Sequence, residues 1–186
     1  MKSVFLFFLL IMSWTAQAND LVKGYIVLSG QDTLQCQIKL RGKSPVTDYT
    51  TLVIINEQGE EKVYKAKEKK VRAYGFDFSG VQYDYRFVEI KKTYESGFFR
   101  LIENGKNYIL YENKVSSTNN SVTVTHSHYV IFKSNGEYVD LTTHLLGKWK
   151  KNLEAFFEED PEALKKLENV SRLEIPQFIR SLNEVQ

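Results

Sequence analysis

Polar and apolar residues alternate along most of the chain between Val22 and Leu141, and Gly or Asn interrupts the alternation at short intervals. Because successive side chains of a strand point to opposite faces, alternation with a period of two predicts half-buried strands. The Gly- and Asn-containing turns join each strand to the next as antiparallel hairpins, about ten strands in all. The predicted strands are Val22–Ser29, Leu34–Leu40, Thr51–Asn56, Lys62–Ala66, Val71–Phe76, Val81–Ile90, Phe98–Ile102, Lys106–Tyr111, Ser121–Phe132 and Tyr138–Leu141.

Two connections between these strands are looser in composition than the others. The segment 41–49 contains Gly42, Ser44 and Pro45, and the segment Asn113–Asn120 is rich in Ser and Asn. Both compositions are typical of loops, where binding residues often lie. We therefore expect two surface loops that are candidate binding elements.

The pattern changes after Leu141, where large apolar residues recur at the spacing of a helix. Asp160-Pro161-Glu162 predicts the start of a second helix, because Asp is a good N-cap and Pro is tolerated at the first helical position. Pro176 opens a third, short helix. The apolar helix residues are Leu145, Leu146, Trp149, Leu153, Phe156, Phe157, Ala163, Leu164, Leu167, Phe178, Ile179 and Leu182.

The predicted fold class is α+β, mostly β. An antiparallel meander would close into a barrel or fold over as two packed sheets, and two or three C-terminal helices would pack on it. Residues 19–186 would form a single domain, with the sheet or barrel in 19–141 and the helical segment in 142–186. No Gly- or Ser-rich linker separates the strands from the helices, which favours one shared core.

The first eighteen residues have the three parts of a secretory signal peptide. Met1-Lys2-Ser3 is basic, Val4–Met12 is apolar, and Ala16-Gln17-Ala18 offers small residues for cleavage between Ala18 and Asn19. The alternative is a membrane anchor, but the apolar run is far shorter than the roughly twenty residues that span a bilayer. We therefore expect a secreted or periplasmic, cell-envelope protein that has no transmembrane segment after cleavage.

The charge balance is close to neutral. The chain has 25 Lys and Arg residues and 23 Asp and Glu residues, for a formal net charge of +2. This balance gives no reason to expect a nucleic-acid partner. The densest basic run is 62–72, which we interpret as a solvated connection between strands, with a polyanion site as the alternative.

Cys36 is the only cysteine, so the chain has no intramolecular disulfide. It alternates with polar residues and shares a predicted strand face with Leu34, Ile38 and Leu40. This pattern predicts a small core residue, and a nucleophile would in addition need a nearby base and an exposed thiolate.

His126-Ser127-His128 is the one spacing that suggests a metal site. Residues two apart on a strand share a face, so both imidazoles could reach one ion, with His144 or an acidic side chain as a third ligand. The alternative is a pair of hydrogen-bonded polar residues on a largely apolar face. No motif for serine, cysteine or phosphoryl-transfer chemistry is found, so we expect no catalytic residue and no cofactor.

Aromatic residues mark one face of the strand at 81–90. Val81, Tyr83, Tyr85 and Phe87 fall on one face, and Gln82, Asp84 and Arg86 fall on the other. Tyr83 and Tyr85 are therefore candidates for a ligand cavity. The alternative is that they belong to the core of a β-rich domain.

Short motifs along the chain resemble an uncharacterised family of secreted and envelope proteins common in Bacteroidetes. The resemblance rests on Lys23–Val27 and Asp32–Leu34, on Leu110-Tyr111, and on the aromatic-acidic stretch Phe156–Pro161 before the last helices. It implies a signal peptide, an N-terminal hairpin and a helical C-terminal segment, and it implies no activity.

Three functional hypotheses follow. The leading one is a non-enzymatic secreted or envelope protein that acts through a binding surface, with a protein or a small ligand of the envelope as its partner. The second is a barrel that binds a small ligand such as a lipid or a sugar. The third is a metal-dependent hydrolase built on His126 and His128.

Overall fold

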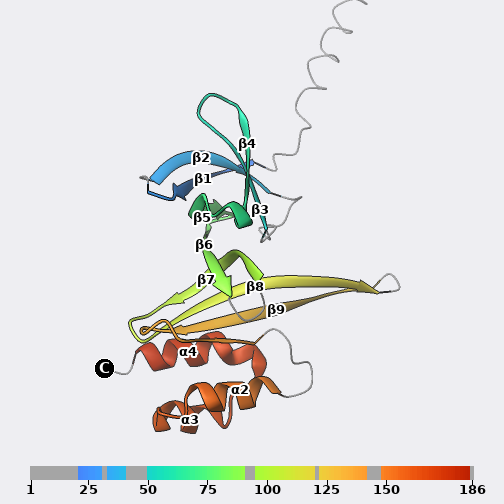
Figure 1. Ribbon diagram of the computed structural model, residues 1–186. Coiled ribbons are helices and arrows are strands. Elements are labelled where there is room, and N and C mark those ends of the chain that lie inside the picture. The colour runs from blue at the N-terminus through green and yellow to red at the C-terminus, as the bar shows by residue number, and fades with distance from the viewer. Residues whose placement is uncertain are drawn as a thin grey trace, which may run out of the picture.

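Ten antiparallel strands form one sheet in the computed structural model, which describes residues 21–30, 33–40, 50–90, 95–119, 122–141 and 148–184 (Figure 1). The antiparallel strands predicted from the sequence are confirmed. The Ala18–Asn19 cleavage site and the predicted loop 41–49 lie outside the described residues. The strands are β1 (Leu21–Leu28), β2 (Thr33–Lys39), β3 (Thr51–Ile55), β4 (Glu61–Lys65), β5 (Val71–Phe78), β6 (Val81–Ile90), β7 (Glu95–Asn104), β8 (Tyr108–Asn119), β9 (Val122–Lys133) and β10 (Tyr138–Asp140).

The strand order departs from sequence order at one place. The order across the sheet is β10-β9-β8-β7-β6-β5-β1-β2-β3-β4, so β5 pairs with β1 instead of β4. The short helix η1 (Ala66–Glu68) follows β4, and the chain then returns to add β5 on the free side of β1. Alternation identifies a strand but carries no information on which strand becomes its neighbour, so this pairing is not visible in the sequence pattern.

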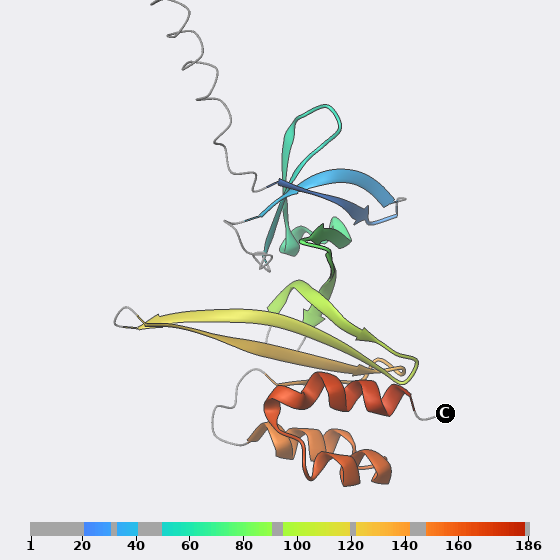
Figure 2. The same cartoon turned by 180° about the vertical axis from the view of Figure 1, so that it is seen from behind.

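The predicted barrel is wrong, and the described strands form one continuous sheet instead of two separate ones. The described strands form a single open sheet with β4 and β10 at its edges. The helices cover one face at the C-terminal end, so the apolar side chains there are buried without closure of the sheet. Figures 1 and 2 show the helices against β8 and β9 at one end of the molecule, and β1–β4 at the other.

The Ser- and Asn-rich segment Asn113–Asn120 was predicted to be a loop, and this prediction is wrong. The strand β8 continues to Asn119 and pairs with β9 from Tyr108↔Lys133 to Asn119↔Val122. Strand pairing uses backbone groups, so a polar composition does not prevent it. The β8–β9 hairpin extends well beyond the layer of helices (Figure 1).

Three α-helices follow the sheet, as the sequence predicts: α2 (Lys148–Phe156), α3 (Pro161–Leu167) and α4 (Ile175–Asn183), with the short helix η2 (Arg172–Glu174) before α4. Asp160 caps α3, because its carboxylate accepts a hydrogen bond from the Ala163 amide at 3.0 Å. No helix of the described residues has the length and apolar character needed to cross a membrane.

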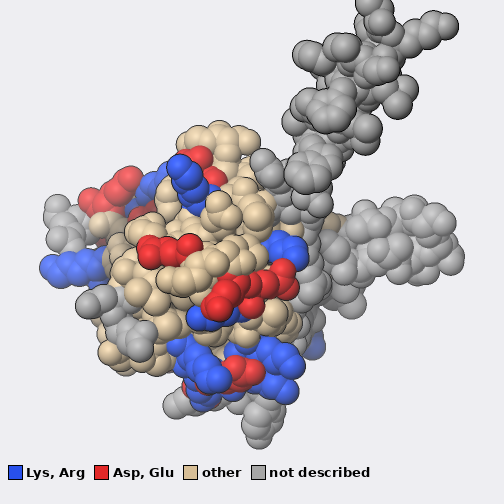
Figure 3. Space-filling model, turned by 90° about the horizontal axis from the view of Figure 1, so that it is seen from above, with Lys and Arg blue, Asp and Glu red and all other residues tan. Residues whose placement is uncertain are grey.

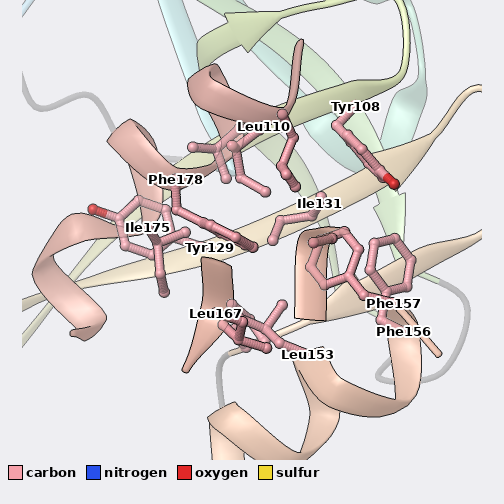
Figure 4. Packing of buried hydrophobic residues seen from close by; sticks show 14 residues of the cluster. Tyr108, Leu110, Tyr129, Ile131, Leu153, Phe156, Phe157, Leu167, Ile175 and Phe178 are labelled. Carbon is pink, nitrogen blue, oxygen red and sulfur yellow. The ribbon is translucent and has the colours of Figure 1, made fainter. Parts of the chain in front are cut away.

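The helices and the sheet share a large core. The ring of Phe157 contacts Tyr108 edge-on at 5.3 Å and Phe178 at 5.6 Å, so sheet and helix residues interleave (Figure 4). Each large apolar side chain that is fully buried stabilises the fold by roughly 1.5–3 kcal/mol. The buried members are Tyr108, Leu110, Tyr129, Ile131, Leu141, Leu153, Phe156, Phe157, Ala163, Leu167, Ile175, Phe178, Ile179 and Leu182.

A second core lies under the N-terminal strands. Its aromatic part is built on β5 and β6, where the rings of Tyr74 and Tyr85 stack at 4.7 Å. Cys36 is half-buried at the margin of this core, and Leu34 on the same strand is 44% exposed, so the predicted buried face of β2 is buried only from Ile38 onward. The buried members are Ile26, Ile38, Leu40, Leu52, Ile54, Ala66, Val71, Tyr74, Phe76, Tyr85 and Phe98.

The register places both large cores on one face of the sheet. Tyr85 pairs with Arg100 and Arg100 pairs with Glu112, which lies two residues from Leu110 on β8. Paired residues share a face, and so do residues two apart. The opposite face carries a small cluster of Val88, Ile90, Phe99 and Val130.

Candidate functional site

A hollow of about 450 Å³ opens over the face of the sheet opposite the two large cores. Its floor follows a row of paired residues across three strands, Val27 on β1, Ala73 on β5 and Arg86 on β6. We call it the arginine hollow. It is lined by Val27, Arg72, Ala73, Arg86, Phe87 and Tyr111.

An irregularity in β5 brings Arg72 to this hollow. Val27 pairs with Ala73, but the next residue, Leu28, pairs with Val71, so Arg72 is an extra residue on β5. In such a β-bulge two successive side chains lie on the same side of the strand. Arg72 therefore lines the hollow together with Ala73, whereas strict alternation would have placed it on the core face with Tyr74.

Tyr25, Gly75 and Asp84 form the next row on the same face. Tyr25 pairs with Gly75, and Gly75 pairs with Asp84. A Cβ atom on Gly75 would lie 2.6 Å from the Oδ1 atom of Asp84 and 2.6 Å from Cε1 of Tyr25. Because glycine leaves this space free, the Tyr25 ring crosses β5 and its hydroxyl donates a hydrogen bond to Asp84.

Arg86 lies between two phenols. Partial burial raises the pKa of Tyr25, the hydrogen bond to Asp84 raises it further, and the adjacent guanidinium of Arg86 lowers it. Burial likewise raises the pKa of Tyr111, and the charge of Arg86 opposes this increase. The half-buried Arg86 side chain is therefore close to both Tyr25 and Tyr111, at the lining of the hollow.

Neither arginine of the hollow has a carboxylate within 4.0 Å in the part of the chain that the structure describes. Asp84 is the nearest acidic residue in the rows described above, and it accepts the hydrogen bond of Tyr25. Two lysines of the basic run that lie just before Arg72 are paired. The Nζ atom of Lys69 lies 2.9 Å from Glu89, and that of Lys70 lies 3.3 Å from Glu68.

The two predicted metal ligands share a face but differ in environment. His126 is exposed, whereas His128 is 3% exposed, with its Nε2 atom 2.6 Å from Oδ1 of Asp140 and its ring edge-on to Phe99. Among the described residues, no group of three or more His, Cys, Asp or Glu side chains is arranged to hold a metal ion. His144 lies outside those residues.

Tyr83 and Tyr85 lie on the core face of β6. The ring of Tyr85 is 7% exposed and stacks on Tyr74, and the ring of Tyr83 stacks on Phe76 at 5.4 Å. The guanidinium of Arg100 covers Tyr83 at 4.3 Å from the ring centre. Neither tyrosine lines the arginine hollow, which opens on the opposite face.

Sequence reasoning placed Arg86 on the polar face of its strand but did not identify the hollow. The signal that was available is the run of small residues on β5, Ala73 and Gly75, directly opposite Arg86 and Asp84. Small residues in a strand often mark close approach by another group. Arg72 lines the hollow only because of the β-bulge, and the pattern of polar and apolar residues does not predict that bulge.

Comparison of the chain with protein-family models, with curated proteins and with solved structures finds no match. The resemblance to secreted proteins of Bacteroidetes therefore stays a prediction, and the functional argument rests on the geometry of the site.

Proposed function

We propose that the protein is a secreted or envelope binding protein without catalytic activity, and that the arginine hollow is its ligand site. The observation that carries this proposal is the pair Arg72 and Arg86, which have no carboxylate partner among the described residues and line one hollow together. A charged group on a protein surface is most often paired or fully solvated. The half-buried charge of Arg86, which has no carboxylate within 4.0 Å among the described residues, therefore favours a ligand.

The apolar walls of the hollow support the same proposal. Val27 and Ala73 contribute apolar side chains to its lining, and ligand sites typically combine apolar walls with a few polar groups that fix orientation. The volume of about 450 Å³ lies within the range of small-molecule sites. An open sheet has no barrel interior in which a ligand could bind. A small ligand would therefore bind on the face of the sheet instead.

The predicted export of the protein supports a binding function outside the cytoplasm. It rests on the predicted signal peptide and on the family resemblance. N-terminal sequencing of protein isolated from the envelope or the medium tests it, and we expect the mature chain to begin at Asn19. A mature protein that retains Met1 would contradict the secretory assignment.

Native mass spectrometry of protein purified from its own host tests the binding function. We expect a bound small molecule on the wild-type chain that is lost in the double variant Arg72→Gln/Arg86→Gln. The matched control is Arg180→Gln, which removes an arginine on α4 that pairs with Glu103 at 3.2 Å, on another element than the hollow. Retention of the same bound mass in the double variant, or no bound mass in any form, would overturn the assignment of the site.

A further inference from the structure

We infer that the arginine hollow recognises the carboxylate group of a small organic acid whose ring or apolar body lies against Val27 and Ala73. This inference rests on the proposed function and names the chemical class of the ligand. It is argued from the chemistry of the two guanidinium groups, the way Arg86 is held, and the size of the charged surface around the hollow.

The guanidinium group matches an oxyanion in shape as well as in charge. Its planar fork offers two parallel N–H donors, so it binds a carboxylate in a bidentate manner, which a lysine does not. Arg72 and Arg86 line the same hollow from adjacent strands, β5 and β6. In the complex we infer, the two guanidinium groups share one bound carboxylate.

Tyr25 and Tyr111 lie beside Arg86 and limit the space open to its side chain. The hydroxyl hydrogen of Tyr25 is directed to Asp84, which leaves the Tyr25 oxygen as an acceptor toward the neighbouring Arg86. Tyr111 flanks Arg86 from β8. A side chain that is already ordered loses less conformational entropy on binding, so Tyr25 acts as a positioning residue for Arg86.

The charged surface around the hollow is too small for a polyanion. A nucleic acid or a polyanionic polymer needs an extended basic stripe. Here Lys69 and Lys70, which precede Arg72, are each paired with a glutamate. At the end of the molecule that carries β1–β4, which Figure 3 shows from above, basic and acidic side chains are interspersed. One or two negative charges on a compact ligand match this arrangement.

The carboxylate can come from two sources, an acidic sugar or the C-terminus of a short peptide. We test both with isothermal titration calorimetry on the full mature chain, using each acid and its uncharged counterpart. The sugar pair is galacturonate and galactose, and the peptide pair is acetyl-Ala-Phe as the free acid and as the amide. Inorganic phosphate is the fifth probe, because it separates carboxylate recognition from general oxyanion binding.

We expect one of the two acids to bind at least 10-fold more tightly than its uncharged counterpart and than phosphate. A hydrogen bond to a charged group contributes about 1.5–3 kcal/mol, so Arg86→Gln should weaken binding of that acid roughly 10- to 100-fold. Arg86→Lys keeps the charge but loses the fork, and we expect it to recover only part of this loss. Arg180→Gln should bind as the wild type does, and circular dichroism confirms that each variant is folded.

Several results would overturn the inference. They are equal affinity for an acid and its uncharged counterpart, tighter binding of phosphate than of either acid, and wild-type affinity in folded Arg72→Gln and Arg86→Gln variants. Failure to bind any of the five probes at millimolar concentration would also overturn it. If native mass spectrometry still finds a ligand that depends on the two arginines, the proposed function stands and only the carboxylate assignment fails.

Discussion

The side-chain amide of Asn183 at the end of α4 completes the backbone hydrogen bonding of Tyr108 at the start of β8. Its Oδ1 atom accepts from the Tyr108 amide at 3.0 Å, and its Nδ2 atom donates to the Tyr108 carbonyl at 3.0 Å. Gly105 in the preceding turn leaves the space that this amide occupies, because a Cβ atom there would overlap it. One side chain therefore joins the last helix to the β7–β8 turn.

Replacing Asn183 with Ala should destabilise the protein. The Tyr108 amide and carbonyl are part-buried, and the loss of a partner there costs about 1–3 kcal/mol. Urea denaturation measures the change in the free energy of unfolding. The control is Asn169→Ala, an exposed asparagine in the turn after α3, for which we expect a change within about 0.5 kcal/mol. Equal stability of the two variants would show that the Asn183 amide contributes nothing.

Replacing Gly75 with Ala should also destabilise the protein, because the new Cβ atom would collide with the Tyr25 ring and the Asp84 carboxylate. Such overpacking costs about 1–3 kcal/mol. A double-mutant cycle with Tyr25→Ala checks the cause, since removing the ring takes away one of the two colliding groups. We expect Gly75→Ala to cost less in that background. An unchanged cost would mean that the ring does not depend on the glycine.

Stability should decrease in alkaline solution, partly through Tyr108. Burial, with a further contribution from Asp160, raises the pKa of Tyr108 from about 10 to about 12. The unfolded chain then releases this proton before the folded protein does, so stability is fully present below pH 10 and falls as the pH rises from 10 toward 12. Urea midpoints measured between pH 8 and pH 11.5 should fall less steeply in Tyr108→Phe than in the wild type. Parallel curves would contradict the assignment.

Cys36 should react slowly with thiol reagents. Burial raises the pKa of its thiol to about 11, so the reactive thiolate is scarce near neutral pH. We expect a bulky maleimide at pH 8 to label the native protein much more slowly than the urea-unfolded protein. Cys36→Ala should cost on the order of 1 kcal/mol and leave ligand binding intact. Rapid labelling of the folded protein would count against a structural role.

Truncation after Gly147 should yield insoluble or partly unfolded protein. It removes α2, α3 and α4 and exposes Leu110, Ile131 and the other sheet residues of the shared core. Size-exclusion chromatography and thermal melting of the fragment test this. A monomeric fragment that melts cooperatively near the full-length temperature would show that the sheet does not depend on the helices.

Local chemistry explains which parts of the fold could be predicted from the sequence. Alternation located the strands, and the Asp160-Pro161 pair located the start of α3, because both signals act within a few residues. The Asn183–Tyr108 contact spans 75 residues, and the Tyr25–Asp84 contact spans 59. Such pairs depend on which distant elements pack together, which no local pattern encodes.

The candidate site was missed for a related reason. The sequence pattern placed Arg86 on the polar face of β6. Its role as a binding residue depends on Tyr25, which lies beside it because β1 pairs with β5. Arg72 reaches the hollow only because β5 holds one residue more than β1 at this point. The His128–Asp140 pair likewise joins β9 to β10. Nothing in the sequence distinguished Asp140 from the other acidic residues.

The placement of β1 between β2 and β5 has a consequence for how the chain folds. Every other neighbouring pair in the sheet is joined by a single connection, so those pairs can form early as local hairpins. The strand β1 can pair with β5 only after β2, β3, β4 and η1 have been synthesised. Closing that long loop is entropically slower than forming any hairpin. We therefore expect the β1–β5 ladder to form late. This ladder builds the floor of the arginine hollow, so the hollow would form only when β1–β4 have joined β5–β10.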